Sequence, residues 1–171
     1  AINKEKLILN ILDGQGTIGD KGIVPKVNIL KNYNYDTIKG YSHDAELAKS
    51  YLAKAGYPNG ENFPEVVLEL TFGHPLQEKV AIEVQNQLKN TLNISITIEE
   101  EKMSTLIDRA ASGRSQMNHF TWLAEYPSPM DFLNVFYGGL ENKDNANYSW
   151  PNTTRYRNDN YDKILEQALI T

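Results

Sequence analysis

The chain has 171 residues and a net charge of −5, with 17 basic and 22 acidic residues whose signs are interspersed. This length suffices for one domain with its own core, and the composition is ordinary for a globular protein. A nucleic-acid partner is not expected, because binding to phosphates needs a clustered basic face. The chain has no cysteine, which excludes disulfides, zinc–thiolate sites and cysteine nucleophiles.

The two ends of the chain predict a piece of a longer protein. No apolar run approaches the roughly 20 residues that cross a bilayer, and no basic leader followed by an apolar stretch begins the chain. The first residue is Ala1, and the last helical pattern runs to Thr171 without a terminating Gly or Pro.

Two helices are expected before the first strand. Lys4 to Leu12 places apolar residues on one side, with Asn3 as a possible N-cap. The glycine-rich run DGQGTIGDKGIVP and the polar, aromatic stretch up to Tyr41 predict loop or extended chain. The second helix, HDAELAKSYLAKAG, has acids in its first turn and Gly56 where a left-handed C′ residue belongs.

Strands and helices then alternate. β-branched and aliphatic runs predict strands at Glu65–Phe72 and Asn93–Glu99, separated by a helix that begins at Pro75. A short helix capped by Ser104 leads to a third strand, Met117–Leu123. Crossovers of this length favour a parallel or mixed sheet. We therefore expect an α/β fold, a mixed sheet with flanking helices, in a single unit that spans residues 1–171.

The last part of the chain predicts a long loop, Asn142 to Asn160, and a closing helix from Tyr161 to Ala168. Matches to the Asn-x-Ser/Thr pattern at Asn93, Asn147 and Asn152 are most simply chance in so Asn-rich a chain.

Several short motifs do not indicate a nucleotide, catalytic or metal site. GQGTIG has the spacing of a dinucleotide loop, but a helix precedes it where a strand is required, so a flexible loop is the better interpretation. Ser128, Glu125 and His119 supply the residue types of a hydrolase without a nucleophile elbow. The acidic run Glu99–Glu101 has no metal-ligand spacing and predicts a solvated turn. Neither an enzyme nor a metal or cofactor site is expected.

The run WLAEYPSPMDFL, residues 122–133, is the strongest candidate for a site. It follows the third predicted strand, and ligands collect at the carboxyl ends of strands in α/β sheets. Trp122 offers a flat apolar contact, and Glu125 can anchor a cation or an ammonium group. A core tryptophan with a surface glutamate explains the residues equally well. His119, three residues before Trp122, is either a sheet histidine or part of the same site.

This run resembles the W-x-A-D-Y-P-D-P-x-x-F-L signature of the bacterial extracellular solute-binding proteins of family 5, the oligopeptide- and dipeptide-binding components of ABC importers. AINKEKLILNILDGQGT resembles the family's first helix and glycine-rich loop. DAELAKSYLAKAGYPNGENFPEVVLEL, AIEVQNQLKNTLNISITIE and RYRNDNYDKILEQA are similar to three further family segments, in the same order. The resemblance covers nearly the whole chain.

The resemblance implies one lobe, the second, of a two-lobed periplasmic-binding-protein-like (type II) fold whose first lobe is absent from this sequence. It assigns the side-chain pocket to Trp122 and the peptide's α-ammonium to Glu125. Leu123 would offer backbone groups to an extended peptide, while His119 and Tyr126 lie near the same pocket. Glu125 stands where the family has an aspartate, and its additional methylene extends the carboxylate by about 1.5 Å.

The implied function is solute capture for ABC-type import, with a short peptide as the expected ligand. A nickel complex, haem or an oligosaccharide remains an alternative solute, and a ligand sensor for a membrane receptor is an alternative role. The expected partners are the importer's membrane subunits, and the expected state is a monomer. The expected location is extracytoplasmic, in the periplasm or at the cell surface, with a lipid anchor in the full-length protein.

Overall fold

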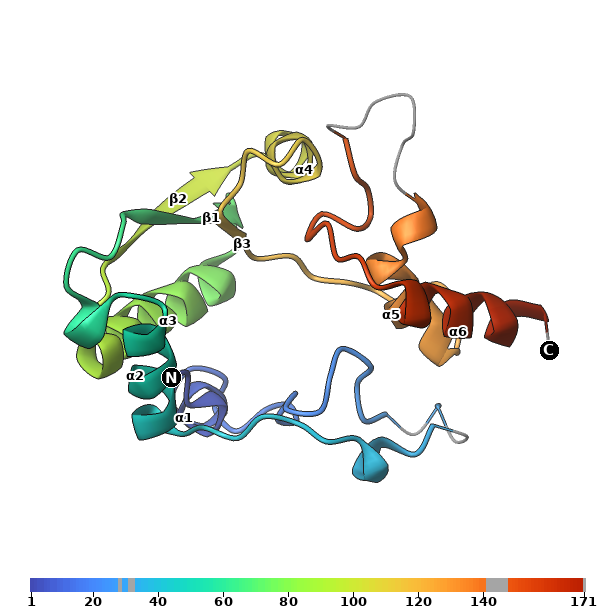
Figure 1. Cartoon of the computed structure of the whole chain (residues 1–171), viewed down its shortest axis with the longest axis horizontal. Helices are drawn as coiled ribbons and strands as arrows, with labels where there is room; N and C mark the ends of the chain where they lie inside the picture. The colour runs from blue at the N-terminus through green and yellow to red at the C-terminus, as the bar shows by residue number, and fades with distance from the viewer. Residues whose placement is uncertain (28, 31–32, 141–147, 171) are drawn as a thin grey trace.

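The structure, a computed structural model, describes residues 1–27, 29–30, 33–140 and 148–170. Its centre is a three-stranded sheet in the order β2-β1-β3 (Figure 1). The central strand β1 (Val66–Thr71) pairs in parallel with β2 (Ile96–Glu101) along its whole length. It also pairs in parallel with β3 (Met117–Asn118) over two residues. The α/β fold expected from the sequence is confirmed.

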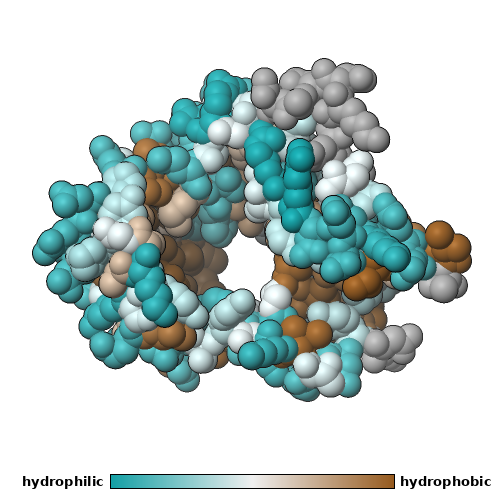
Figure 2. Space-filling view, in the orientation of Figure 1, coloured by the Kyte–Doolittle hydropathy of each residue, from teal (hydrophilic) through white to brown (hydrophobic). Residues whose placement is uncertain are grey.

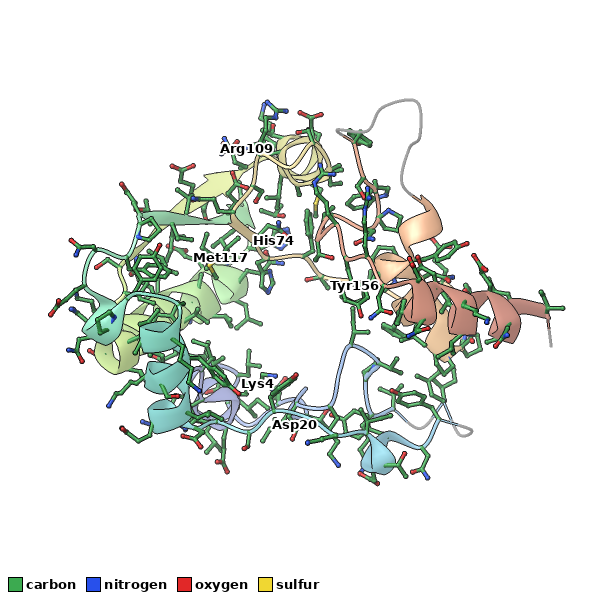
Figure 3. All side chains as sticks on the ribbon, viewed as in Figure 1. Lys4, Asp20, His74, Arg109, Met117 and Tyr156 are labelled. Atoms are coloured by element: carbon green, nitrogen blue, oxygen red, sulfur yellow. The ribbon has the colours of Figure 1, made fainter. Side chains whose placement is uncertain are left out.

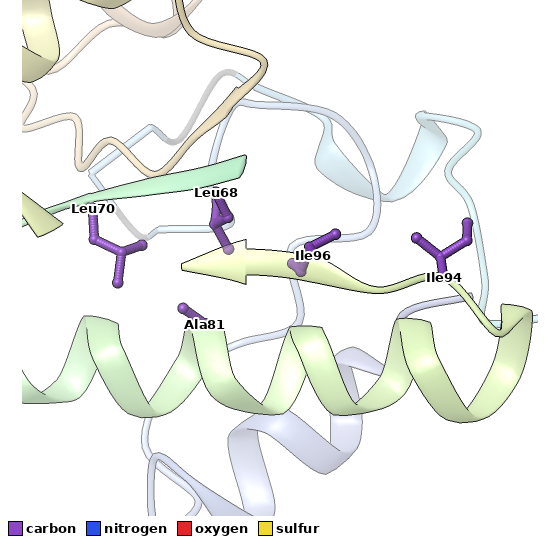
Figure 4. Close-up of a cluster of buried hydrophobic side chains, with 5 residues drawn as sticks. All are labelled: Leu68, Leu70, Ala81, Ile94 and Ile96. Atoms are coloured by element: carbon purple, nitrogen blue, oxygen red, sulfur yellow. The ribbon is translucent and has the colours of Figure 1, made fainter. Parts of the chain in front are cut away.

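The hydrophobic core lies between the sheet and helix α3 (Pro75–Leu92) (Figure 4). Successive side chains of a strand point to opposite faces, so Leu68 and Leu70 of β1 both face α3. Leu70 is fully buried. Burial of one such side chain stabilises the fold by about 1.5–3 kcal/mol. The cluster is completed by residues of α3, of β2 and of the turn before it: Ala81, Ile94 and Ile96.

The opposite face of the sheet is covered by α4 (Met103–Ala111), and it carries a buried charge. Glu69 is 1% exposed, and its carboxylate lies 2.5 Å from Nε of Arg109 on α4, labelled in Figure 3. Leu106 and Ala110 of the same helix are also buried. A carboxylate at this depth requires the guanidinium as its counter-charge.

The first two helices begin where their predicted caps stand. The Asn3 side chain accepts a hydrogen bond from the backbone N–H of Lys6 at the start of α1 (Lys4–Asn10). α2 (Ala45–Lys54) is capped by Asp44, and Gly56 follows with the positive φ of 95° expected after a helix. The 3-10 turn η2 (Pro58–Gly60) then leads to β1.

Three sequence predictions about local structure were wrong. The acidic run Glu99–Glu101, predicted to be a solvated turn, forms the second half of β2. The predicted third strand, Met117–Leu123, pairs only at its first two residues. The backbone N–H of His119 still donates to the backbone carbonyl of Glu69. The chain then leaves the sheet because its next hydrogen bond, from Glu125 N–H, goes to the side chain of Asp131 in α5. Ser104 is not the cap of α4. The helix already begins at Met103, with Lys102 in the extended conformation before it.

The second part of the molecule contains little regular structure. It is built from α5 (Pro129–Leu133), the 3-10 turns η3 (Asn134–Phe136) and η4 (Gly138–Leu140), and α6 (Asp159–Ile170), which confirms the closing helix. The predicted loop, residues 142–160, falls partly outside the described residues, and its described part is irregular until α6 begins. Tyr161 of α6 donates a hydrogen bond to the carbonyl of Leu133, and burial raises its pKa to about 12.

Between α1 and α2, the described residues 11–27, 29–30 and 33–44 form a long arm that runs past the second part of the molecule (Figure 1) and contains the 3-10 turn η1 (Tyr35–Thr37). Figure 2 shows an opening bounded by the arm, the sheet and the region around α5 and α6, with apolar residues on parts of its edge. Among the described residues, no helix is both long and apolar enough to cross a membrane.

Candidate ligand-binding site

A cavity of about 660 Å³ lies where the two parts of the molecule meet. Its walls come from α4, from the extended segment after β3, from η3 and from the loop before α6. Ile23 of the arm completes them. The lining residues are Ile23, Met103, Ile107, Asn118, Phe120, Thr121, Trp122, Leu123, Glu125, Val135, Phe136, Trp150, Pro151, Thr153 and Thr154. The cavity thus contains three of the five predicted site residues: Trp122, Leu123 and Glu125.

Trp122 and Glu125 are held together by one buried carboxylate. The indole Nε1 of Trp122 donates to Oδ2 of Asp131 at 3.1 Å, and the backbone N–H of Glu125 donates to the same oxygen at 3.2 Å. Asp131 is only 5% exposed, whereas Trp122 retains 38% of its surface. The indole is therefore fixed at one edge while part of its ring faces the cavity.

The two prolines of the run place Asp131. Pro127 precedes the helix, and Pro129 occupies the first position of α5, where a missing N–H costs nothing. The Ser128 side chain accepts a hydrogen bond from Met130 N–H and caps the helix. Asp131, in the first turn, is thereby directed back towards the segment that contains Trp122. The two prolines thus help to position Asp131, which binds both Trp122 and the backbone of Glu125.

Leu123 lies between the two fixed residues and is 80% exposed. Within the described part of the chain, its backbone N–H and C=O have no hydrogen-bond partner. An extended segment with free backbone groups can pair with another extended chain as an added strand. The geometry therefore suits the backbone role that the resemblance gives to Leu123.

The structure does not bring the other two predicted residues into the cavity lining. His119 is half-buried, its Nδ1 is buried without a hydrogen-bond partner in the described structure, and burial lowers its pKa from the usual 6.5. A neutral imidazole is expected there near pH 7. The Tyr126 ring is 43% exposed, and its hydroxyl accepts a hydrogen bond from Asn134 at 3.4 Å.

The sequence reasoning missed the other aromatic residues of the cavity lining. Phe120 and Trp150 meet edge to face, with ring centroids 6.0 Å apart, and Phe136 meets Tyr156 at the same separation. Phe120, Phe136 and Trp150 all line the cavity. Trp150 precedes Pro151 through a cis peptide bond in a loop without periodicity. No pattern in the sequence links that loop to residue 122.

A buried asparagine organises the same loop. Asn152 is fully buried. Its amide donates to the carbonyl of Tyr156 at 2.9 Å, and its Oδ1 accepts from the backbone N–H of Tyr156 and the hydroxyl of Thr154. Polar contacts of this kind can fix an irregular loop without an apolar core. This position matched only a chance glycosylation pattern in the sequence.

The site offers little that would suit a metal. In the ranges that the structure describes, no three His, Asp or Glu side chains form a group that could hold a metal ion. Glu125 is the one charged residue among the described residues that line the cavity. The arrangement provides a flat apolar surface, a single carboxylate and free backbone groups.

Comparison with known proteins places this chain and its fold in one class, the solute-binding proteins. The profile of the bacterial extracellular solute-binding proteins, family 5 (middle region), matches residues 1–144. The chain belongs to this family. The fold is that of one lobe of these periplasmic binding proteins.

Two curated relatives and two solved structures illustrate the similarity. The oligopeptide-binding protein OppA of Bacillus subtilis is 23% identical over 98% of this chain and 30% of its own length. Heme-binding protein A of Haemophilus influenzae is 26% identical over 99% of this chain and 29% of its own. This chain thus spans about a third or less of both relatives.

A periplasmic oligopeptide-binding protein from Borrelia burgdorferi is 30% identical, with a TM-score of 0.76 over 98% of this chain and 31% of that one. The binding protein DppA from Helicobacter pylori, solved in complex with the peptide STSA, is 27% identical, with a TM-score of 0.77 over 98% of this chain and 30% of that one.

Proposed function

We propose that this chain is the second lobe of a longer two-lobed protein that captures short peptides outside the cytoplasmic membrane and delivers them to an ABC importer. The observation that carries the proposal is the pairing of Trp122 and Glu125 on one cavity wall, fixed by Asp131. Relatives named for oligopeptide binding, and a structural neighbour in complex with a peptide, support it.

In this proposal the peptide's α-ammonium meets the Glu125 carboxylate, and a side chain or the peptide plane lies on the Trp122 ring. A buried charge-assisted contact contributes about 1.5–3 kcal/mol to binding, and the aromatic contact about 0.5–1.5 kcal/mol. Leu123 pairs with the backbone of the peptide, and this contact does not depend on the peptide's side chains. Specificity therefore rests first on the amino terminus and the backbone of the ligand.

Closure of the two lobes is the step that makes these contacts strong, because it removes water from them. The 171-residue chain is accordingly expected to fold but to bind peptides weakly or not at all. Calorimetric titration of this chain and of the full-length protein with a dipeptide and tripeptide library tests this. Tight binding by the single lobe would contradict the role of closure, and no binding by the full-length protein would overturn peptide capture.

The residue-level test is Glu125→Gln in the full-length protein. Loss of the charge is expected to weaken peptide binding roughly tenfold to a hundredfold. Glu100→Gln, at an exposed position on β2 away from the cavity, is the matched control and should bind as the parent does. Unchanged affinity in Glu125→Gln would remove that residue from the proposed site. We also propose that the protein performs no turnover, so bound peptide should be recovered intact.

Haem is the second candidate ligand, because a haem-binding protein is among the relatives. Haem propionates need cationic partners. The described residues that line the cavity include no Lys, Arg or His, so peptide is the better match. Mass spectrometry of ligand retained on the purified full-length protein separates the two. A sensor that signals to a membrane receptor would bind the same ligand, and an uptake assay in cells distinguishes it from an importer component.

A further inference from the structure

We propose, as an extension of the peptide-binding function above, that this cavity selects peptides with a large apolar side chain and rejects those with an acidic one. The proposal concerns the side chain of the ligand and not its amino terminus. It is carried by the composition of the walls, by the position of the one charge and by the way the aromatic rings are held.

The walls of the cavity are mostly apolar. Three aromatic rings besides Trp122 face it, together with aliphatic side chains and one methionine from α4, η3 and the arm. These residues are Ile23, Met103, Ile107, Phe120, Leu123, Val135, Phe136, Trp150 and Pro151. The volume of about 660 Å³ exceeds that of any single side chain, so a bulky apolar group can enter. Removal of such a group from water favours binding in proportion to the area covered.

The only charge on the described lining is negative. Glu125 lies at this wall, and the polar residues beside it are Asn118 and threonines. An acidic ligand side chain would enter an apolar space without a cationic partner and would be repelled by Glu125. The same carboxylate attracts the ligand's ammonium group, so an amino terminus with an adjacent apolar side chain matches both features of the cavity.

The rings are held before any ligand arrives. The Trp122 indole is bonded to buried Asp131, and Trp150 packs edge to face on Phe120. Asn152 fixes the loop that follows Trp150. A pocket that is already ordered loses little conformational entropy on binding, so the side-chain preference is fully expressed in affinity.

The test is a positional scan of tri-alanine on the full-length protein that carries this chain. Phe, Leu or Glu replaces Ala at each of the three positions, and affinities are measured by calorimetry. At one position or more, Phe is expected to bind roughly tenfold or more tighter than Glu. Phe and Glu peptides of equal affinity, within about twofold at all positions, would overturn the preference and leave peptide capture intact. Failure of every peptide would overturn the proposed function itself.

A second experiment introduces a positive charge at the rim of the cavity. Thr154→Arg places a guanidinium at the exposed edge of the cavity, and the Phe-over-Glu ratio is expected to fall roughly tenfold. Thr37→Arg is the matched control. Both threonines are exposed, and each donates one local hydrogen bond, Thr154 to Asn152 at 3.0 Å and Thr37 to Asn34 at 2.8 Å. An unchanged ratio in Thr154→Arg, with native circular dichroism, would also contradict the proposal, and the scan of the parent protein decides it even if that variant fails to fold.

Discussion

The sheet half, residues 45–118, and the cavity half, residues 119–140 with 148–170, are stabilised in different ways. Buried residues in the sheet half are mainly apolar, and five of them form a cluster between β1, β2 and α3. In the cavity half the buried residues are mainly polar: Asp131, Ser149 and Asn152, with Leu165 of α6 as the buried apolar residue. Aromatic rings there remain partly exposed while buried polar groups fix the loops that carry them. We infer that the sheet half supplies stability and that the cavity half supplies most of the binding surface.

The largest loss of stability is expected when the ion pair between Glu69 and Arg109 is broken. Arg109→Ala leaves the carboxylate of Glu69, 1% exposed, without its counter-charge, and should reduce the free energy of unfolding by about 3–5 kcal/mol. Arg114→Ala is the control, because Arg114 pairs with Asp108 at the exposed surface, where such a pair is worth about 0.2–1 kcal/mol. Urea denaturation of both variants gives the comparison. Equal effects would show that the Glu69 pair is not buried in solution.

The next prediction compares a leucine-to-alanine substitution in each of the two halves. Leu70→Ala opens a cavity in the fully buried cluster and should cost about 2–5 kcal/mol of unfolding free energy. Leu123→Ala, at an 80% exposed position, should change stability by less than about 0.5 kcal/mol. Thermal and urea unfolding measure both. A large loss in Leu123→Ala would contradict the assignment of the cavity half to binding.

Asp131 tests how the cavity half is ordered. Asp131→Ala removes the acceptor of two hydrogen bonds, and the expected cost is about 1–3 kcal/mol. The Trp122 indole should also become more mobile, with lower fluorescence anisotropy in a Trp150→Phe background that leaves one tryptophan. Asp159→Ala, at the exposed start of α6, is the control. Unchanged anisotropy in Asp131→Ala would contradict the role of this carboxylate.

The smallest effect concerns His119, at the junction of the two halves. Burial lowers its pKa below 6.5 in the folded protein, so the unfolded chain binds the proton more readily. Its contribution to stability is complete above pH 6.5 and decreases as the pH falls through the range between 6.5 and the folded-state pKa. His119→Gln should flatten the pH dependence of unfolding in this range, whereas His43→Gln, at an exposed position, should not. Parallel curves for the parent and His119→Gln would refute this.

Local signals in the sequence predicted α1 and much of the sheet half correctly. Asn3 caps α1, the αL glycine follows α2, and the aliphatic run from residue 66 to residue 71 forms the central strand. Each feature depends on neighbours within one turn or one strand, so a short window of sequence contains it. The cap of α4 lies two residues before the predicted one, at Lys102 instead of Ser104.

The sequence predicted less of the structure of the cavity half. The third strand was predicted five residues too long, because the pattern from residue 117 to residue 123 does not reveal that Asp131 draws the chain away from β1. Trp150 and Asn152 lie in a loop whose composition predicts nothing about their partners. The contacts of this loop join residues 16 to 44 positions apart, from Asn152 with Phe136 to Arg155 with Ala111 of α4.

The sequence by itself determined the α/β class, the membership that the residue 122–133 signature indicated, and the pairing of an indole with an acid. Those features follow from periodicity and from short motifs that are contiguous in the chain. Only the tertiary structure decided which residues face one another across the cavity. Their chain separations are large, and buried polar contacts, which have no period in the sequence, set the path of the loops between them.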